Sequence, residues 1–146
     1  MFKIGIVENF HKDGIKLLEN HPNFEYEIID DVSKENLIKE LPKFDGLTLR
    51  VAKLGSDVLS KCKKLKVISR HGVGYDNVDI NHLKKNNITL LITATGNALA
   101  VAEHVMYMML SLSKGVTLYD SEVRSGNFKK NANKIETYEL YKKEIL

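Results

Sequence analysis

Short apolar segments recur along the first two thirds of the sequence at a nearly constant spacing. They begin near residues 3, 24, 46, 66 and 88, which is every 20 to 22 residues. Each interval has room for one strand, one short helix and two loops. Regular alternation of strands and helices is typical of a parallel sheet with helices packed on both faces. The spacing therefore predicts an α/β domain built on five parallel strands.

The predicted strands cover residues 3–7, 24–29, 45–50, 65–69 and 88–93, and the first predicted helix covers residues 11–20. Ser33, Ser56 and Asp79 precede three further helical segments. Each is a predicted N-cap, because its side-chain oxygen can accept backbone N–H groups of the first turn. Pro42 is predicted to end the helix that follows Ser33. Cys62 is predicted to lie in the helix that follows Ser56.

The last third of the chain departs from this alternation. Residues 97–114 predict one long helix whose apolar side chains occupy nearly every face. A helix that is apolar all round is normally buried on most sides, so we expect another domain or a second copy of the chain to cover it. Residues 126–146 are polar and are expected to be irregular. The expected domain boundary lies between residues 1–96 and residues 97–146.

Length and charge exclude several classes of protein. The chain has 146 residues, of which 43% are hydrophobic and 28% charged, an ordinary composition for one globular domain. The net charge of +3 comes from lysines that are spread over expected solvated faces. The sequence contains no nucleic-acid-binding motif, so no nucleic-acid partner is expected.

The remaining composition argues against a membrane, secreted or metal-binding protein. The longest apolar stretch, residues 97–112, is interrupted by Glu103 and His104 and does not predict a membrane-spanning helix. The first residues do not resemble a signal peptide, so we expect the protein to be located in the cytoplasm. Cys62 is the single cysteine, which is too few for a disulfide or a zinc site, and we expect it to be a small buried hydrophobic residue. No metal is expected.

Polar and glycine-containing segments follow three of the predicted strands. Arg50 ends the third strand, Arg70 begins a loop after the fourth, and Asn97 follows the fifth. Ligands of open parallel sheets bind beyond the carboxyl ends of the strands. In the middle loop Gly72 and Gly74 flank a valine, so the backbone can adopt positive φ and its N–H groups can hold an anion.

Two interpretations of this loop remain open on the residues alone. Arg50 and Arg70 suit a carboxylate ligand, because a guanidinium can bind both carboxylate oxygens. The loop can equally be a tight turn in which Gly72 and Gly74 serve only the backbone conformation. The pair is not a dinucleotide-binding fingerprint, since no third glycine follows at the required place.

Two longer motifs are more specific. The first is Arg70-His71-Gly72-Val73-Gly74-Tyr75-Asp76-Asn77-Val78-Asp79, and the second is Gly96-Asn97-x-x-x-Val101-Ala102-Glu103-His104. Together they resemble the D-isomer-specific 2-hydroxyacid dehydrogenase family, in its phosphoglycerate dehydrogenase-like branch. The resemblance covers about residues 45 to 130 well and the earlier residues only in pattern. It implies an NAD-dependent oxidoreductase that transfers a hydride between its cofactor and a D-2-hydroxy acid or 2-oxo acid.

The resemblance also implies a fold and roles for individual residues. Residues 1–96 would be a flavodoxin-like substrate domain, and residues 97–146 would be an inter-domain helix and the start of a dinucleotide-binding domain. The implied substrate-binding residues are Arg50, Gly72, Val73, Gly74 and Asn97, and the implied cofactor contacts are Val73 and Val101. NAD is the implied cofactor, with NADP left open.

The catalytic groups implied by the resemblance are not among these residues. In the family the glycine-rich dinucleotide turn and the catalytic arginine, glutamate and histidine would follow Leu146. We therefore expect no catalytic residue in this chain, no activity of the 146 residues alone, and a homo-oligomer formed through the helix at 97–114.

Two other functions fit parts of this pattern. The first is a non-catalytic module, derived from the same family, that binds a carboxylate or mediates dimerisation. The second is a phosphorylatable receiver domain, which needs an acidic cluster after the first strand and an aspartate at the end of the third. Here the first strand is followed by Glu8 and Asn9 and the third ends in Arg50, which disfavours the receiver domain.

Overall fold

The computed structural model describes residues 1–131 and 135–144. Within it the chain forms two compact units, Met1–Gly96 and Asn97–Leu146. The boundary between them falls directly after the fifth strand. The two units are described separately.

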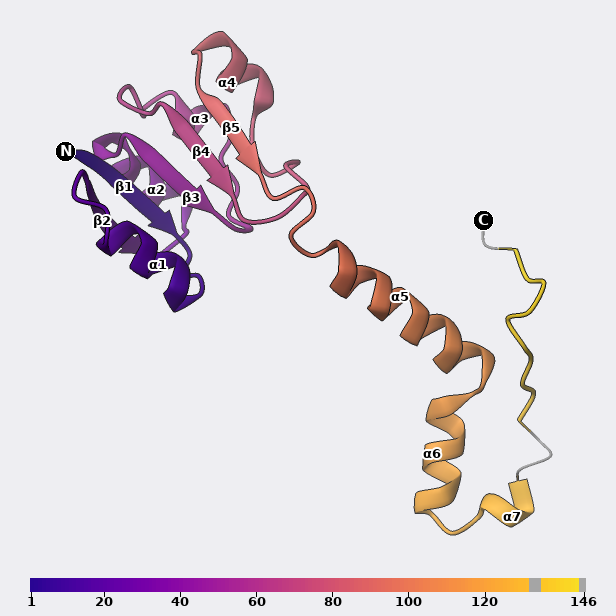
Figure 1. Ribbon diagram of the computed structural model, residues 1–146. Coiled ribbons are helices and arrows are strands. Elements are labelled where there is room, and N and C mark those ends of the chain that lie inside the picture. The colour runs from indigo at the N-terminus through magenta and orange to yellow at the C-terminus, as the bar shows by residue number, and fades with distance from the viewer. Residues whose placement is uncertain (132–134, 145–146) are drawn as a thin grey trace. The chain divides into compact units, whose positions relative to one another are not determined.

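The first unit contains one five-stranded sheet, in which all neighbouring strands are parallel (Figure 1). The strands are β1 (Phe2–Val7), β2 (Phe24–Ile29), β3 (Gly46–Leu49), β4 (Val67–Arg70) and β5 (Thr89–Ile92). Their order across the sheet is β2-β1-β3-β4-β5, which is the flavodoxin-like order. The prediction of an α/β domain with five parallel strands is confirmed, and the predicted strand ends differ from the observed ones by at most two residues.

Helices connect the strands. They are α1 (Lys12–Glu19), α2 (Lys34–Glu40), the 3-10 turn η1 (Leu41–Lys43), α3 (Ser56–Leu59) and α4 (Ile80–Lys85). The predicted cap of α4 is confirmed, because Asp79 Oδ1 accepts the N–H of His82 at 2.9 Å. Ser33 occupies the N-cap position of α2, but its side chain makes no capping hydrogen bond.

The predicted cap of α3 is wrong. Ser56 is the first helical residue, and Gly55 stands at the N-cap position. Instead, Asp57 Oδ1 accepts one of the first-turn N–H groups, that of Val58, at 2.9 Å. The helix ends at Leu59, so Cys62 lies beyond it and not within it.

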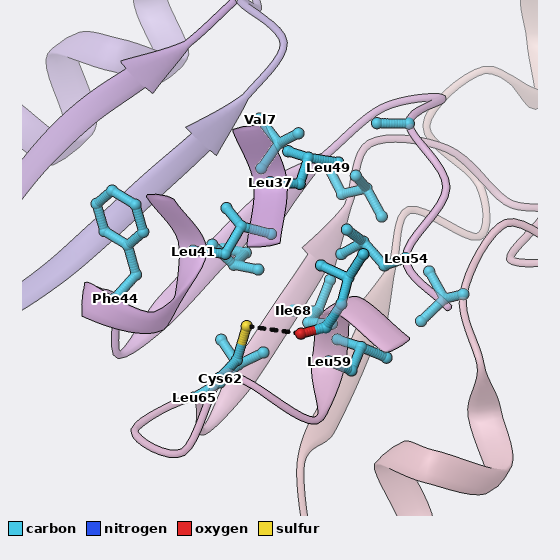
Figure 2. Close-up of a cluster of buried hydrophobic side chains, with 14 of the residues drawn as sticks. Val7, Leu37, Leu41, Phe44, Leu49, Leu54, Leu59, Cys62, Leu65 and Ile68 are labelled. Atoms are coloured by element: carbon cyan, nitrogen blue, oxygen red, sulfur yellow. Dashed lines mark hydrogen bonds between the residues drawn. The ribbon is translucent and has the colours of Figure 1, made fainter. Parts of the chain in front are cut away.

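The main hydrophobic core lies on one face of the sheet, beneath α2 and α3. Figure 2 shows how strand residues meet helix and loop residues there: Val7, Leu49 and Ile68 from the strands, and Leu37, Leu41, Leu54 and Leu59 from the segments between them. All seven are almost fully buried. Burying such a side chain stabilises the fold by roughly 1.5–3 kcal/mol.

Cys62 belongs to this core. Its Sγ donates to the carbonyl oxygen of Val58 at 3.6 Å (Figure 2), and burial raises the pKa of the thiol to about 11. The prediction that Cys62 is a small buried hydrophobic residue is confirmed.

The opposite face of the sheet is covered by α1 over its β2 side. Tyr26 on β2 donates its hydroxyl to Glu19 Oε1 of α1 at 2.7 Å. Ser69, Thr89 and Leu91 lie on this same face by strand register and are exposed in the first unit, Leu91 by 52%.

The second unit contains α5 (Ala98–Ser113), α6 (Val116–Arg124) and α7 (Phe128–Asn131). The predicted long helix is confirmed, with Asn97 and Lys114 as its caps. Gly115 has φ of 60° and is the N-cap of α6, a helix that the sequence analysis did not predict. The expectation of an irregular segment from residue 126 is wrong for α7, where the Asn127 carbonyl accepts the N–H of Lys130 at 2.9 Å and closes a helical turn. Residues 132–134 and 145–146 of that segment lie outside the described residues.

The apolar side chains of α5 are largely exposed. Leu99 and Leu112 are each 75% exposed, and Met106 is 50% exposed. Ser113 at the end of the helix is fully buried, and its carbonyl accepts the N–H of Tyr138 at 2.9 Å. Across the described residues no helix has the length and hydropathy needed to cross a membrane.

Candidate functional site

Three loops meet at the carboxyl edge of the sheet, because β1, β3 and β4 run in the same direction and end there. The loop after β4 is joined to β3 by the N–H of His71, which donates to the carbonyl of Leu49 at 2.8 Å. Arg50 Nη1 donates to the carbonyl of Asn9 at 3.3 Å, which joins the loops after β3 and β1. The rings of Phe10 and His71 are tilted against each other, 6.4 Å apart.

The loop that contains Gly72 turns sharply as it leaves β4. Gly72 has φ of 148°, a conformation that side chains rarely adopt. Its N–H donates to the carbonyl of Arg70 at 3.0 Å, and its own carbonyl accepts the N–H of Thr93 at 3.1 Å. Of the two glycines in this loop, Gly72 has positive φ and Gly74 does not.

The next residues offer free hydrogen-bond donors. Among the described residues no protein group accepts the N–H of Val73 or of Gly74. The Val73 side chain is 43% exposed, so the segment is open to solvent. Successive free N–H groups on a loop are suited to binding an anion.

Two positive charges lie at the same edge. Neither Arg50 nor Arg70 forms an ion pair with any carboxylate in the part of the chain that the structure describes. Arg70 Nη1 donates to the carbonyl of His71 at 2.8 Å. The guanidinium groups are thus held by neutral oxygens, and their charge remains available to an anionic ligand.

Asn77 connects the two arginine-bearing loops, and the sequence analysis did not identify it. Its Oδ1 accepts from Arg70 Nε at 3.4 Å. Its Nδ2 donates to the carbonyls of Arg50 at 3.3 Å and Ala52 at 2.8 Å. The only signal in the sequence was its position inside the motif that follows β4.

Glu8 is a second residue that the sequence analysis left without a role here. Its Oε2 accepts the N–H groups of Val51 at 2.7 Å and Ala52 at 2.8 Å. Glu8 itself has φ of 65°, which is uncommon for a residue with a side chain. The sequence shows only that Glu8 directly follows a strand, and this position does not predict a contact with Val51 and Ala52.

A small hollow lies beside this loop. It has a volume of about 150 Å³ and is lined by Phe10, Thr48, Ser69, Arg70, His71 and Thr93. Within the described residues, the Thr48 hydroxyl is a buried side-chain oxygen without a hydrogen-bond partner.

The other two predicted site residues, Asn97 and Val101, belong to the second unit. Asn97 precedes α5, its side chain makes no capping hydrogen bond, and its carbonyl accepts the N–H of Val101 at 2.9 Å. Val101 is 51% exposed. The structure thus brings together Arg50, Gly72, Val73 and Gly74 within the first unit and places Asn97 and Val101 on the second.

The loop after β4 offers an apolar contact for NAD but no free helix N-terminus for its pyrophosphate. Val73 is exposed, and the N-terminus of a helix is a favourable place for a pyrophosphate when its N–H groups are free. The helix after this loop, α4, has the Asp79 carboxylate on its first-turn N–H groups. The described residues also contain no group of three or more histidine, cysteine or acidic side chains placed to bind a metal ion.

Comparison with known proteins identifies the family. Residues 4–143 match the sequence model of the D-isomer specific 2-hydroxyacid dehydrogenase catalytic domain. The D-3-phosphoglycerate dehydrogenase of Archaeoglobus fulgidus is 30% identical over 129 residues, which are 88% of this chain and 24% of that protein. The hydroxypyruvate reductase of Thermotoga maritima is 30% identical over 134 residues, 91% of this chain and 44% of that protein.

A solved structure agrees with these matches. The D-lactate dehydrogenase of Aquifex aeolicus, complexed with NAD and lactic acid, superposes with a TM-score of 0.74 at 26% identity, over 86% of this chain and 38% of that one. The chain therefore spans less than half the length of each of these three relatives. The match extends over nearly the whole chain all the same, and the chain belongs to the D-isomer specific 2-hydroxyacid dehydrogenase family.

Proposed function

We propose that residues 1–96 form the carboxylate-binding part of the substrate domain of an NAD-dependent oxidoreductase that acts on a D-2-hydroxy acid or 2-oxo acid in the cytoplasm. The observation that carries the proposal is the pair of free N–H groups at Val73 and Gly74, at the same sheet edge as the unpaired guanidinium of Arg50. The relatives support the substrate class, because lactic acid is a 2-hydroxy acid and hydroxypyruvate is a 2-oxo acid.

The contribution of these residues to the reaction is to hold the acid. The free N–H groups of Val73 and Gly74 donate to the carboxylate, and Arg50 neutralises its charge. Asn97 is proposed to contact the substrate, and Val73 and Val101 are proposed as apolar contacts of the nicotinamide. NAD is proposed rather than NADP because the solved relative contains NAD. When bound, the cofactor would accept a hydride from a 2-hydroxy acid or, in its reduced form, donate one to a 2-oxo acid.

We further propose that residues 97–146 are an inter-domain helix and the beginning of a cofactor domain. Hydride transfer requires a bound cofactor held against the substrate, and the family resemblance implies that the groups holding the cofactor are not among these residues. The 146 residues on their own are therefore expected to be inactive. Measurable oxidation of NADH by the purified chain in the presence of pyruvate would contradict this.

The second unit suggests a homo-oligomer. Along α5 the apolar side chains of Val105, Met106 and Leu110 are 40% to 50% exposed. Exposed apolar surface of this kind favours association. We propose that two copies of the chain cover α5, which would also suit the alternative function, a non-catalytic carboxylate-binding or dimerisation module.

The binding proposal is tested by titrating pyruvate into the isotopically labelled chain and following backbone amides by nuclear magnetic resonance. We expect the amide signals of residues 72–74 to shift with saturation. Arg50→Met should weaken binding about tenfold or more, since it removes a charged hydrogen-bond donor. Lys53→Met is the matched control, because it removes a positive charge from the same loop. Equal effects of the two substitutions, or no shift in the wild type, would overturn the proposal.

A further inference from the structure

The segment that carries Arg50 is held in an unusual way. Residues 50–52 follow β3 and belong to no helix or strand. Arg50 is exposed, and Val51 is 71% exposed, so side-chain packing does not fix the first two residues. Their backbone is held instead by hydrogen bonds from two side chains that belong to other loops.

Glu8 holds the donors of this segment. One oxygen, Oε2, accepts two consecutive N–H groups, those of Val51 and Ala52. Hydrogen bonds to a carboxylate are about twice as strong as those between neutral groups. Glu8 reaches this position from a φ of 65°, and uncommon backbone conformations of this kind persist where the surroundings require them.

Asn77 holds the acceptors of the same segment. Its Nδ2 donates to the carbonyls of Arg50 and Ala52, at 3.3 and 2.8 Å. Its Oδ1 accepts from Arg70 Nε, so it links the segment to the second arginine as well. Two N–H groups and two carbonyls of residues 50–52 are thereby bound by side chains from outside the segment.

The consequence concerns the direction of Arg50. With its backbone fixed, the side chain extends to the carbonyl of Asn9, to which Nη1 donates at 3.3 Å. Asn9 directly follows Glu8, so the same loop holds both the backbone and the guanidinium. A binding group that is already in place loses less conformational freedom when a ligand arrives.

We propose that Glu8 and Asn77 are positioning residues that hold Arg50 ready to bind the carboxylate of the substrate. This inference rests on the proposed function of Arg50 as the carboxylate-binding residue. Glu8 and Asn77 act through the backbone of residues 50–52 and do not touch the substrate.

The sign of one measurement separates positioning from simple electrostatics. Glu8 carries a negative charge at the site of an anion, so its direct effect is repulsive and its removal by Glu8→Gln would tighten pyruvate binding. Positioning predicts the opposite result, a dissociation constant about tenfold higher. Glu25→Gln is the matched control, because Glu25 is exposed on the edge strand β2, and it should leave pyruvate binding unchanged. Tighter or unchanged binding in Glu8→Gln would overturn the proposal.

A double-mutant cycle shows whether the effect passes through Arg50. In the Arg50→Met background, Glu8→Gln and Asn77→Ala should produce no further loss of pyruvate affinity, because the group that they position is absent. Full additivity would mean that the two residues act on general stability, and it would refute the assignment.

Hydrogen exchange tests, without any ligand, whether Glu8 holds the backbone N–H groups of Val51 and Ala52. The amides of Val51 and Ala52 should exchange slowly in the wild type despite the exposure of Val51, and about tenfold faster or more in Glu8→Gln. Fast exchange of these amides in the wild type would overturn the proposal that Glu8 holds the segment, whether or not pyruvate binds. Slow exchange together with no pyruvate response in the wild type would instead refute the proposed function, and with it the assignment of a substrate-positioning role.

Discussion

The guanidinium of Arg70 lies over Gly72, in the space that a Cβ atom at residue 72 would fill. The same glycine has φ of 148°. Two independent requirements, a backbone conformation and a close approach, therefore exclude a side chain at this position. This relationship explains why residue 72 is a glycine. At Gly74 neither requirement applies.

Gly72→Ala should destabilise the protein much more than Gly74→Ala. The added methyl group displaces Arg70 and forces an L-residue into a disfavoured conformation, at a cost of about 1–3 kcal/mol. At Gly74 the nearest atom to an added Cβ is Asp76 Oδ1 at 3.4 Å, an ordinary contact. Urea unfolding of the two variants gives the comparison. Equal free energies of unfolding would contradict both the backbone requirement and the Arg70 contact at Gly72.

Asp79→Ala should shorten or weaken α4. It removes the carboxylate that accepts the N–H of His82, and the loss of such a cap costs about 1 kcal/mol. Asp76→Ala removes the same charge from the same loop without removing a cap, so it serves as the control. Thermal unfolding followed by circular dichroism measures both. A control variant as destabilised as Asp79→Ala would argue that the loop charge, and not the cap, is responsible.

Burial of Cys62 predicts a loss of stability in alkaline solution. The folded state holds the pKa of this thiol at about 11, against an ordinary value of 9.0. Between those values the unfolded chain releases a proton that the folded chain keeps. The free energy of unfolding therefore falls as the pH rises, by at most about 1.4 kcal/mol per pH unit. At pH values well below 9.0 the thiol is protonated in both states and has no effect.

Cys62→Ala supplies the comparison for this pH dependence. The variant lacks the thiol, so its free energy of unfolding should fall less between pH 9 and pH 11 than that of the wild type. Parallel curves for the two proteins would mean that the thiol titrates normally in the folded state.

The sheet could be predicted because each of its strands has a local cause. Five apolar strands at regular intervals, and an aspartate one residue before α4, identified the sheet and the cap of α4. Ser56 misled the prediction because a serine at a helix start can be the cap or the first helical residue. In the structure Asp57, and not Ser56, accepts a first-turn N–H, that of Val58, and the composition of the segment does not reveal this.

The candidate site was predicted only in its charged and glycine residues. Arg50 and Gly72 follow strands directly, so the sequence placed them at the carboxyl edge. Glu8 and Asn77 act through hydrogen bonds across 43 and 25 residues of chain, to the N–H of Val51 and the carbonyl of Ala52. Such contacts depend on the register of β1, β3 and β4, and that register is not readable from local pattern.

A charge placed on α5 should dissociate the proposed oligomer. Met106 is 50% exposed and neighbours Val105, Met109 and Leu110 on one side of the helix. In a symmetric dimer Met106→Glu places two carboxylates against apolar surface, and burying unpaired charge costs several kcal/mol. His104→Glu is the control, since residue 104 lies on the opposite side of α5 and the added charge would stay in water. Sedimentation at micromolar concentration should give a dimer for the wild type and for His104→Glu, and a monomer for Met106→Glu. A monomeric wild type would contradict the oligomer outright, whereas dissociation by both substitutions would mean that α5 pairs through more than one face.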